Sequence, residues 1–282
     1  MKIIIGENAM TMLASWIGVD SHGTTSAYIM SESRFTWSIK NTYDYGKKVF
    51  ASKRYPELFG YVGEVLFPSI VLSQIIEMID TEILLKESMS CECKHKVISE
   101  KICYSLSKYP DVFGGNTIQI VHITRDTIVE GYPSFHTYLL EYGKDKVWRD
   151  QKISMPEKSG VIKVLGSGAK EFNENYNRFQ HMQNSSTSRN VYQCFVDTLT
   201  NIKDPCCGGA PQLVGLYRKP LSAGINYGIL YKKKRYLLGM EIPQGSMFEN
   251  VDWRNELFEI CDGRTKQIVP GAARQPKPSS II

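Results

Sequence analysis

The chain has 282 residues, of which 42% are apolar and 22% are charged, a composition typical of a globular protein with one large core. Its 34 basic and 29 acidic side chains are too nearly balanced to indicate a nucleic-acid-binding surface. The apolar runs are too short for a membrane-spanning helix or a secretory signal. We therefore expect a cytoplasmic protein that binds neither nucleic acid nor membrane, with its seven cysteines reduced.

The first part of the chain reads as a block of strands followed by two helices. Short runs of strand-forming residues between turn residues predict four strands, over 12–19, 25–31, 48–52 and 57–62. The tetrapeptide Asp20-Ser21-His22-Gly23 has the composition of a hairpin turn between the first two. Apolar residues at three- and four-residue intervals then predict helices over 66–79 and 97–109.

The same alternation continues to the end of the chain. Strand patterns return over 117–123, 135–142 and 161–165. Two helical patterns follow, over 169–182 and 191–202. The last predicted strands cover 212–217, 224–231 and 235–240. Residues 264–282 are rich in Pro, Gly, Ser, Lys and Arg, so we expect a flexible polar tail.

Blocks of strands separated by helix pairs indicate the fold class. Each helix pair must bury its apolar stripe against a sheet, which favours two packed sheets with a helical layer on each outer side. We therefore expect an α+β fold: a four-layer αββα sandwich of two antiparallel sheets with helices on both outer faces. It would form a single domain over 1–263, in which residues 1–10 are an N-terminal extension.

Four short segments carry chemical groups at notable positions. Ser31-Glu32-Ser33-Arg34-Phe35-Thr36 closes the second predicted strand. Gly46-Lys47-Lys48-Val49-Phe50 places Lys48 sixteen residues after Glu32. Leu165-Gly166-Ser167-Gly168 ends a later strand, and Asp204-Pro205-Cys206-Cys207-Gly208-Gly209 joins a helix to a strand.

Taken in order, these segments resemble those of Ntn hydrolases, the proteasome β-type subunits and the related peptidase HslV. The family has Asp where this chain has Glu32, and Ser where it has Cys207. Phe59-Gly60-Tyr61-Val62-Gly63 is similar to the Gly-rich strand that lines the family's substrate pocket. The resemblance covers about 11–231, and implies that a backbone amide near Gly63 makes the oxyanion contact.

The resemblance implies a threonine-type peptidase or amidohydrolase. In such enzymes an N-terminal Thr, Ser or Cys attacks an amide carbonyl, and its own α-amine serves as the base. Lys48 then matches the catalytic lysine, and Glu32 keeps it charged and oriented. Ser167 and Asp204 position the amine and its water, with Cys207 in place of the family's serine. The resemblance also implies a peptide or protein substrate, a homo- or hetero-oligomer, and no cofactor.

The identity of the nucleophile stays open at this point. Aligning 16–19 with the family's first strand puts Ala14 at the nucleophile position, and alanine cannot attack a carbonyl. Thr11 and Ser15 are the alternatives, and each requires a shifted or bulged first strand. If translation began at Met10, removal of that residue would leave Thr11 with a free amine. With the preceding residues attached, the nitrogen is an amide, so a noncatalytic assembly or recognition subunit is the alternative function.

No metal site is predicted. Cys91-x-Cys93-x-His95 is metal-like, but its spacing is not a usual zinc pattern and it falls in a predicted interhelical loop. Other histidines have no Ser or carboxylate partner at a recognisable spacing: His22, His122, His136 and His181. Phosphate-binding and metallopeptidase motifs are absent from the sequence.

Overall fold

A computed structural model of the chain describes residues 11–38, 40–110, 117–126, 131–219 and 223–274. The expected N-terminal extension, residues 1–10, lies outside the described residues, and so does the last part of the expected tail, residues 275–282. The single domain over 1–263 and the flexible tail therefore stay predictions. In the part of the tail that is described, Ile268 forms an antiparallel bridge with Cys261.

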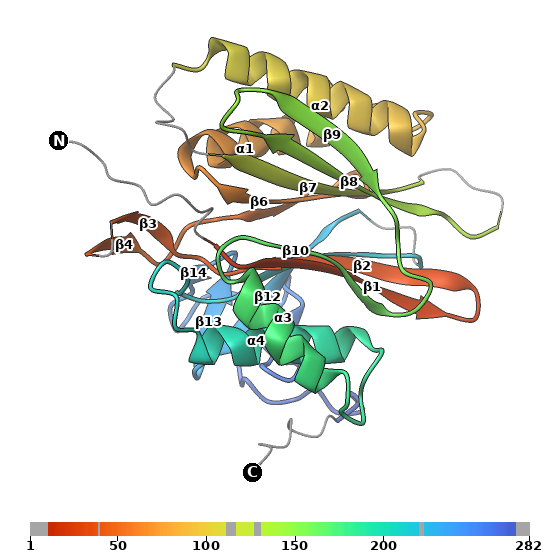
Figure 1. The fold of residues 1–282 in the computed structure, drawn as a ribbon. Helices are drawn as coiled ribbons and strands as arrows, with labels where there is room; N and C mark the ends of the chain where they lie inside the picture. Colours follow the sequence, from red (N-terminus) through yellow and green to blue (C-terminus); the bar gives the residue numbers. More distant parts are fainter. Residues whose placement is uncertain (1–10, 39, 111–116, 127–130, 220–222, 275–282) are drawn as a thin grey trace.

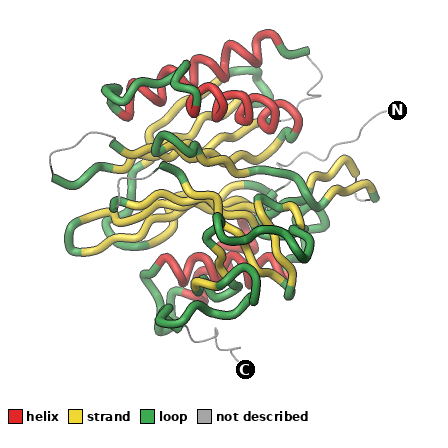
Figure 2. Tube along the Cα trace, turned by 180° about the vertical axis from the view of Figure 1, so that it is seen from behind, coloured by secondary structure: helices red, strands yellow, loops and turns green. Residues whose placement is uncertain are grey.

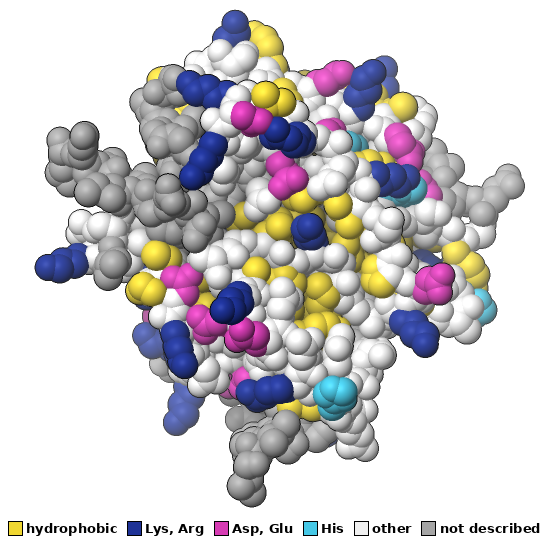
Figure 3. All heavy atoms as spheres, viewed as in Figure 1, with side chains coloured by type: hydrophobic (Ala, Val, Ile, Leu, Met, Phe, Trp, Pro, Cys, Tyr) yellow, Lys and Arg dark blue, Asp and Glu magenta, His cyan; other side chains and the backbone are white. Residues whose placement is uncertain are grey.

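The described residues contain four helices in two pairs, each pair following a block of strands. The helices are α1 (Leu66–Asp80), α2 (Cys91–Lys108), α3 (Ala169–Phe179) and α4 (Ser188–Asn201). Within this part of the chain, no helix is long and apolar enough to cross a membrane. On the face drawn in Figure 3, acidic and basic side chains are intermixed, in keeping with the near balance of charge in the sequence.

The larger of the two main sheets has nine strands and is antiparallel except where β12 meets β15. Its main path is β10 (Gly160–Leu165), β1 (Leu13–Asp20), β2 (Gly23–Ser31), β11 (Gln212–Tyr217), β12 (Ile225–Tyr231), β13 (Lys234–Leu237) and β14 (Met240–Glu241). Two short strands extend it beside β12, β15 (Trp253–Arg254) and β16 (Ile260–Cys261). The sheet therefore combines segments that are far apart in the sequence, and β1 and β2 lie between β10 and β11.

The smaller main sheet is a five-stranded antiparallel meander. Its order is β5 (Val49–Ala51), β6 (Glu57–Gly63), β7 (Ile118–Arg125), β8 (Phe135–Tyr142) and β9 (Trp148–Ile153). A separate hairpin of β3 (Phe35–Ser38) and β4 (Asn41–Tyr43) projects beside the larger sheet (Figure 1).

Three large apolar cores hold these elements together, and a fourth, smaller one surrounds Trp253. One joins α1 and α2 to the five-stranded sheet and includes Phe59. A second contains residues of both sheets, among them Leu13 and Leu58. The third joins the nine-stranded sheet to α3 and α4 and includes Trp16. Figures 1 and 2 show the strands in the middle of the molecule and the helix pairs on its two outer sides. The fold is thus mixed α/β, with two large antiparallel sheets.

The alternation of side chains along the first strand decides which residues reach the space between the sheets. Leu13 and Ile17 belong to the core between the sheets. Met12, Ala14 and Trp16 belong to the core beneath α3 and α4. Because successive side chains of an extended chain point to opposite faces, Ala14 cannot face the space that Leu13 faces.

Several elements differ from their sequence patterns. The predicted strand over 235–240 is divided into β13 and β14, because Leu238 and Gly239 have positive φ values of 49° and 86°. Strand β9 was not predicted, since its residues are mostly polar and exposed at a sheet edge. The short strands β3, β4, β15 and β16 were also missed. The other predicted strands and helices are present, with ends shifted by a few residues.

The start of helix α2 corrects the prediction for the metal-like cysteine motif. The helix begins at Cys91, six residues before the predicted start, and the Ser90 hydroxyl caps it by accepting from the Cys93 amide at 3.2 Å. The motif therefore lies on the first turns of a helix and not in a loop. The first turns of α2 carry no apolar stripe. The side chains buried there include Lys94 and His95, which make polar contacts. Apolar periodicity therefore did not reveal the start of the helix.

Candidate active site

A fully buried ion pair lies where the two sheets meet. Lys48 precedes β5, Glu32 follows β2, and neither side chain is exposed to solvent. The Lys48 ammonium contacts Glu32 Oε1, while Glu32 Oε2 accepts hydrogen bonds from the amides of Arg34 at 2.6 Å and Gly208 at 3.2 Å. Burial raises the pKa of the Glu32 carboxyl, and the Lys48 ammonium opposes that rise. Removing two charges from water is costly, so a pair of this kind points to a functional site.

Thr11 lies against this ion pair. Lys48 Nζ donates to Thr11 Oγ1 at 2.8 Å, so the lysine contacts both a carboxylate and a hydroxyl. The nitrogen of Thr11 donates to Ser167 Oγ at 3.4 Å, and the carbonyl of Thr11 accepts from the Gly168 amide at 3.2 Å. The structure therefore brings together four of the residues singled out in the sequence, although they come from four separate segments.

Ser167 is linked to Asp204 through a cysteine. Cys207 Sγ lies 3.7 Å from Ser167 Oγ and 3.5 Å from Asp204 Oδ2. Burial raises the pKa of the Cys207 thiol well above its usual range, so the thiol stays protonated and can donate to the Asp204 carboxylate. Asp204 also accepts from the Cys206 amide at 2.9 Å, which fixes the turn. Asp204 is thus linked to Ser167 through its contact with Cys207.

Gln212 is a member of this site that the sequence did not indicate. Its Nε2 donates to the carbonyls of Glu32 at 3.0 Å and Gly46 at 2.9 Å, and its Oε1 accepts from the Lys48 amide at 3.0 Å. This fully buried amide joins the backbones that carry the carboxylate and the lysine. In the sequence it appears only as a polar residue at the start of a strand, which gave no reason to select it.

The other candidate nucleophiles point elsewhere. Ala14 packs in the core beneath α3 and α4. Ser15 lies within β1, and its hydroxyl donates to the Lys163 carbonyl at 3.3 Å. Gly63, expected near the oxyanion, ends β6 with φ of +100° and lies against the Thr117 carbonyl. Of the candidates at the chain start, Thr11 is the one whose hydroxyl contacts Lys48.

The pairing of β1 with its two neighbours is irregular at two places, between Ser15 and Trp16 beside β10 and between Gly18 and Val19 beside β2. In both cases the extra residue lies in the neighbouring strand, Ile162 in β10 and Thr25 in β2. Strand β1 itself therefore contains no inserted residue.

A substitution at Gly166 tests how closely the backbone packs against Thr11. Gly166 has φ of +91°, and a Cβ there would lie 2.0 Å from the Thr11 carbonyl oxygen. We expect Gly166→Ala to lower the free energy of unfolding by roughly 3 kcal/mol, because the backbone must shift as well as tolerate a positive φ. Gly23→Ala is the matched control, since its φ is +96° and nothing lies within 4 Å. Chemical denaturation that gives equal losses for both variants would contradict this.

A second buried polar cluster lies on the face of the five-stranded sheet that packs against α2. Glu57 accepts from His122 at 2.7 Å and pairs with Lys94 at 2.7 Å. The ring of His122 in turn contacts His95 at 2.9 Å, and His95 contacts Asp150 at 2.8 Å. His122 therefore has a carboxylate partner, although none lies at a recognisable spacing in the sequence. The partner lies 65 residues away in the chain, on the neighbouring strand, so local spacing could not reveal it.

This cluster predicts a loss of stability in mild acid. Burial and the neighbouring His122 ring lower the pKa of His95 to about 4. An unfolded imidazole has a pKa of about 6.5, so between pH 6.5 and 4 the unfolded chain binds the extra proton and stability falls by roughly 1–3 kcal/mol. Denaturant titrations at several pH values should show this fall in the free energy of unfolding for the unsubstituted chain and for a variant of the exposed His181. The fall should be smaller for His95→Gln. Equal pH dependence in all three proteins would contradict the prediction.

Comparison with known proteins supports the fold and not a function. No family model and no curated protein matches the chain. Solved structures similar to the chain include Anbu proteins. Anbu from Yersinia bercovieri, described as an ancestral beta-subunit, is 9% identical, with 82% of this chain and 88% of that chain covered and a TM-score of 0.51. At that identity, the likeness shows a related fold alone.

Two further Anbu structures align less closely. The Anbu complex of Pseudomonas aeruginosa, described as a helical assembly, is 12% identical, covers 84% of this chain and 88% of its own, and has a TM-score of 0.49. A Gly-1 mutant from Hyphomicrobium sp. strain MC1 is 12% identical, with 77% and 86% covered and a TM-score of 0.47.

These findings correct the family expected from the sequence. The assignment to proteasome β-type subunits or HslV-like peptidases was wrong, since the similar solved structures reported above are Anbu proteins. Anbu from Yersinia bercovieri is among the structures found, so the chain has an Anbu-like fold.

Proposed function

We propose that this chain is a proteasome-like N-terminal-nucleophile hydrolase that cleaves peptide or amide bonds, with Thr11 as its nucleophile. The observation that carries the proposal is the 2.8 Å contact between Lys48 Nζ and Thr11 Oγ1 beside the buried Glu32 carboxylate. We also infer that the sheets and helix pairs form the four-layer αββα sandwich of Ntn hydrolases. Self-association, as a homo- or hetero-oligomer, stays a prediction.

In the proposed reaction, Thr11 is the first residue of the mature chain. Its α-amine takes the Oγ1 proton while the oxygen attacks the carbonyl carbon of the substrate amide. The proton passes to the leaving nitrogen as the C–N bond breaks, which leaves an ester on Thr11. Water then hydrolyses the ester and restores the hydroxyl and the amine.

The surrounding residues have distinct roles in this proposal. The Lys48 ammonium stabilises the negative charge that develops on Oγ1 and favours the neutral, basic form of the nearby amine. Glu32 holds the ammonium in place, and Ser167 orients the amine, supported by Cys207 and Asp204. A backbone amide near Gly63 remains our proposal for the oxyanion contact.

A noncatalytic assembly or recognition subunit is the second candidate function. It is favoured by the peptide bond between Met10 and Thr11 in the sequence, because an amide nitrogen cannot act as the base. In that case the Lys48 cluster would serve only to hold the start of the first strand against the loop at Ser167.

Covalent labelling distinguishes the two candidates. A chain produced with Thr11 as its first residue is treated with a peptide epoxyketone, which reacts with both the hydroxyl and the amine of an N-terminal nucleophile. We expect one adduct per chain on Thr11, located by peptide mass spectrometry. Ser15→Ala should label normally, whereas Thr11→Ala should not. A folded chain beginning at Thr11 that neither labels nor hydrolyses any peptide in a diverse library would favour the noncatalytic function.

A further inference from the structure

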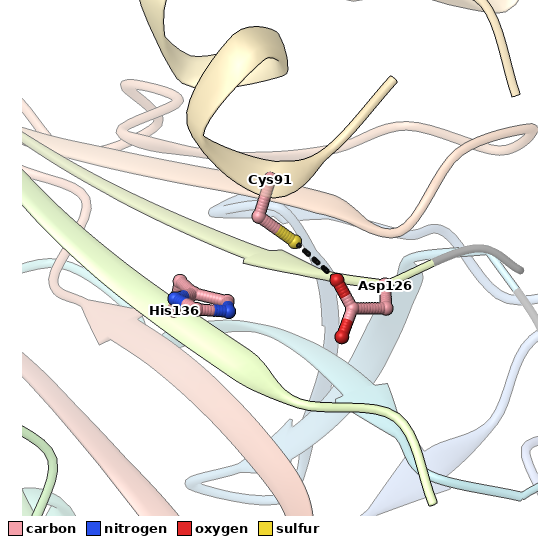
Figure 4. Close-up of side chains that lie close together, drawn as sticks. All are labelled: Cys91, Asp126 and His136. Atoms are coloured by element: carbon pink, nitrogen blue, oxygen red, sulfur yellow. Dashed lines mark hydrogen bonds between the residues drawn. The ribbon is translucent and has the colours of Figure 1, made fainter. Parts of the chain in front are cut away.

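Three potential metal ligands converge beneath the start of helix α2. Cys91 is the first residue of α2, Asp126 follows β7, and His136 lies on β8 (Figure 4). One ligand atom from each lies within 4.8 Å of the other two. None of the three belongs to the site around Thr11. His136 lies beside Phe135, a member of the core between the sheets, so its side chain faces the helical side of the sheet.

The local structure holds these groups in position. Cys91 Sγ donates to Asp126 Oδ1 at 3.2 Å, as the dashed line in Figure 4 marks. Asp126 Oδ2 accepts from the Ser134 amide at 3.0 Å, which fixes the carboxylate. Glu92 Oε1 lies 3.7 Å from His136 Nδ1 and accepts from Lys152 Nζ at 2.8 Å. A small movement of this carboxylate would let it accept the ring N–H when the other ring nitrogen binds a metal.

The donor set indicates which metal would bind. A thiolate, an imidazole and a carboxylate suit zinc and similar divalent transition metals, whereas calcium and magnesium take oxygen ligands. Because the three atoms lie within 4.8 Å of one another, a central ion would lie at most about 2.8 Å from each, against zinc bond lengths of about 2.0–2.3 Å. Side-chain movements of less than about 1 Å would therefore complete three bonds.

We propose that Cys91, Asp126 and His136 bind one zinc-class divalent ion, with water at the fourth position. The thiolate and the carboxylate neutralise the two charges of the ion. The nearby Lys94 ammonium does not disturb this balance, because the Glu57 carboxylate is paired with it at 2.7 Å.

The site differs from the one that the cysteine motif suggested in the sequence. Cys93 is exposed, and His95 contacts His122 and Asp150. Only Cys91 of that motif takes part, and its partners come from β8 and the end of β7. This explains why the spacing of the motif matches no zinc pattern.

Cobalt titration of the reduced, full-length chain tests the proposal. We expect one ion per chain, a thiolate-to-cobalt charge-transfer band, and displacement of cobalt by zinc. Cys91→Ser should remove the band, and His136→Gln should weaken binding at least tenfold. Cys93→Ser is the matched control, because it removes a thiol two residues away that lies outside the cluster. Absence of the band, or a band that survives Cys91→Ser, would overturn the proposal.

A thermal measurement covers the possibility that Cys91→Ser fails to fold. Zinc should raise the melting temperature of the unsubstituted chain, because it binds the folded state, and should leave that of Asp126→Asn unchanged. Equal shifts in both proteins would place the ion elsewhere and contradict the proposal. Chelation should leave labelling of Thr11 unchanged, so the two proposed sites can fail independently.

Discussion

Lys48→Met is expected to reduce the peptidase activity of a chain beginning at Thr11 by about 10³-fold or more, since it removes the charge that stabilises the developing alkoxide. Lys48 Nζ contacts both Thr11 Oγ1 and the Glu32 carboxylate, and its side chain is fully buried. Steady-state turnover of a fluorogenic peptide measures the loss. Activity within a few-fold of the unsubstituted chain would contradict the role given to Lys48.

Two further variants distinguish a loss of catalysis from a loss of folded protein. Lys48→Met leaves the Glu32 carboxylate buried without its partner, which costs about 3–5 kcal/mol of stability. Combining it with Glu32→Gln removes both charges, so the double variant should recover stability but remain inactive. Lys47→Met changes the adjacent lysine, whose ammonium lies over the Phe50 ring, and should alter turnover by about twofold at most.

The second large effect concerns stability alone. Glu57→Gln should lower the free energy of unfolding by about 3–5 kcal/mol, because the Lys94 ammonium would then be buried without a counter-charge. Both side chains are inaccessible to solvent, and Glu57 also accepts from His122 and Thr124. Denaturant unfolding followed by circular dichroism measures the change.

The controls for this effect use the same substitution and the same ion pair. Glu77→Gln on the exposed side of α1 should change stability by about 0.5 kcal/mol or less. Adding Lys94→Met to Glu57→Gln should restore part of the loss, because no charge is then left alone. A double variant less stable than Glu57→Gln would show that the pairing of the two charges is not the cause.

The sequence predicted the order of strands and helices well because each element has its own local signal. Strand β8 and strand β11 have the bounds expected from their patterns. The polar edge strand β9 carries no such signal, since an exposed strand needs no apolar face. The beginning of α2 was missed for a related reason: its first turns are buried by ion pairs and imidazole contacts, which apolar periodicity does not detect.

Site residues that lie in short motifs could be predicted from the sequence. Site residues that are recognised only by their contacts in the folded chain could not. The spacing of Glu32 and Lys48 was sufficient to select both. The preference for Thr11 over Ala14 required the position of the Lys48 ammonium in the folded chain, which contacts Thr11 Oγ1 while Ala14 packs beneath α3 and α4. Gln212 was missed because its importance comes entirely from the backbone atoms that surround it.

The central claim is that Thr11 has a free amine in the mature protein and acts through it. The most direct measurement is the N-terminal residue of the protein purified from its native source, obtained by intact-mass and N-terminal peptide analysis. Our account predicts a mature chain that begins at Thr11. A mature chain with the bond between Met10 and Thr11 intact would contradict it, and so would one that begins at Ser15.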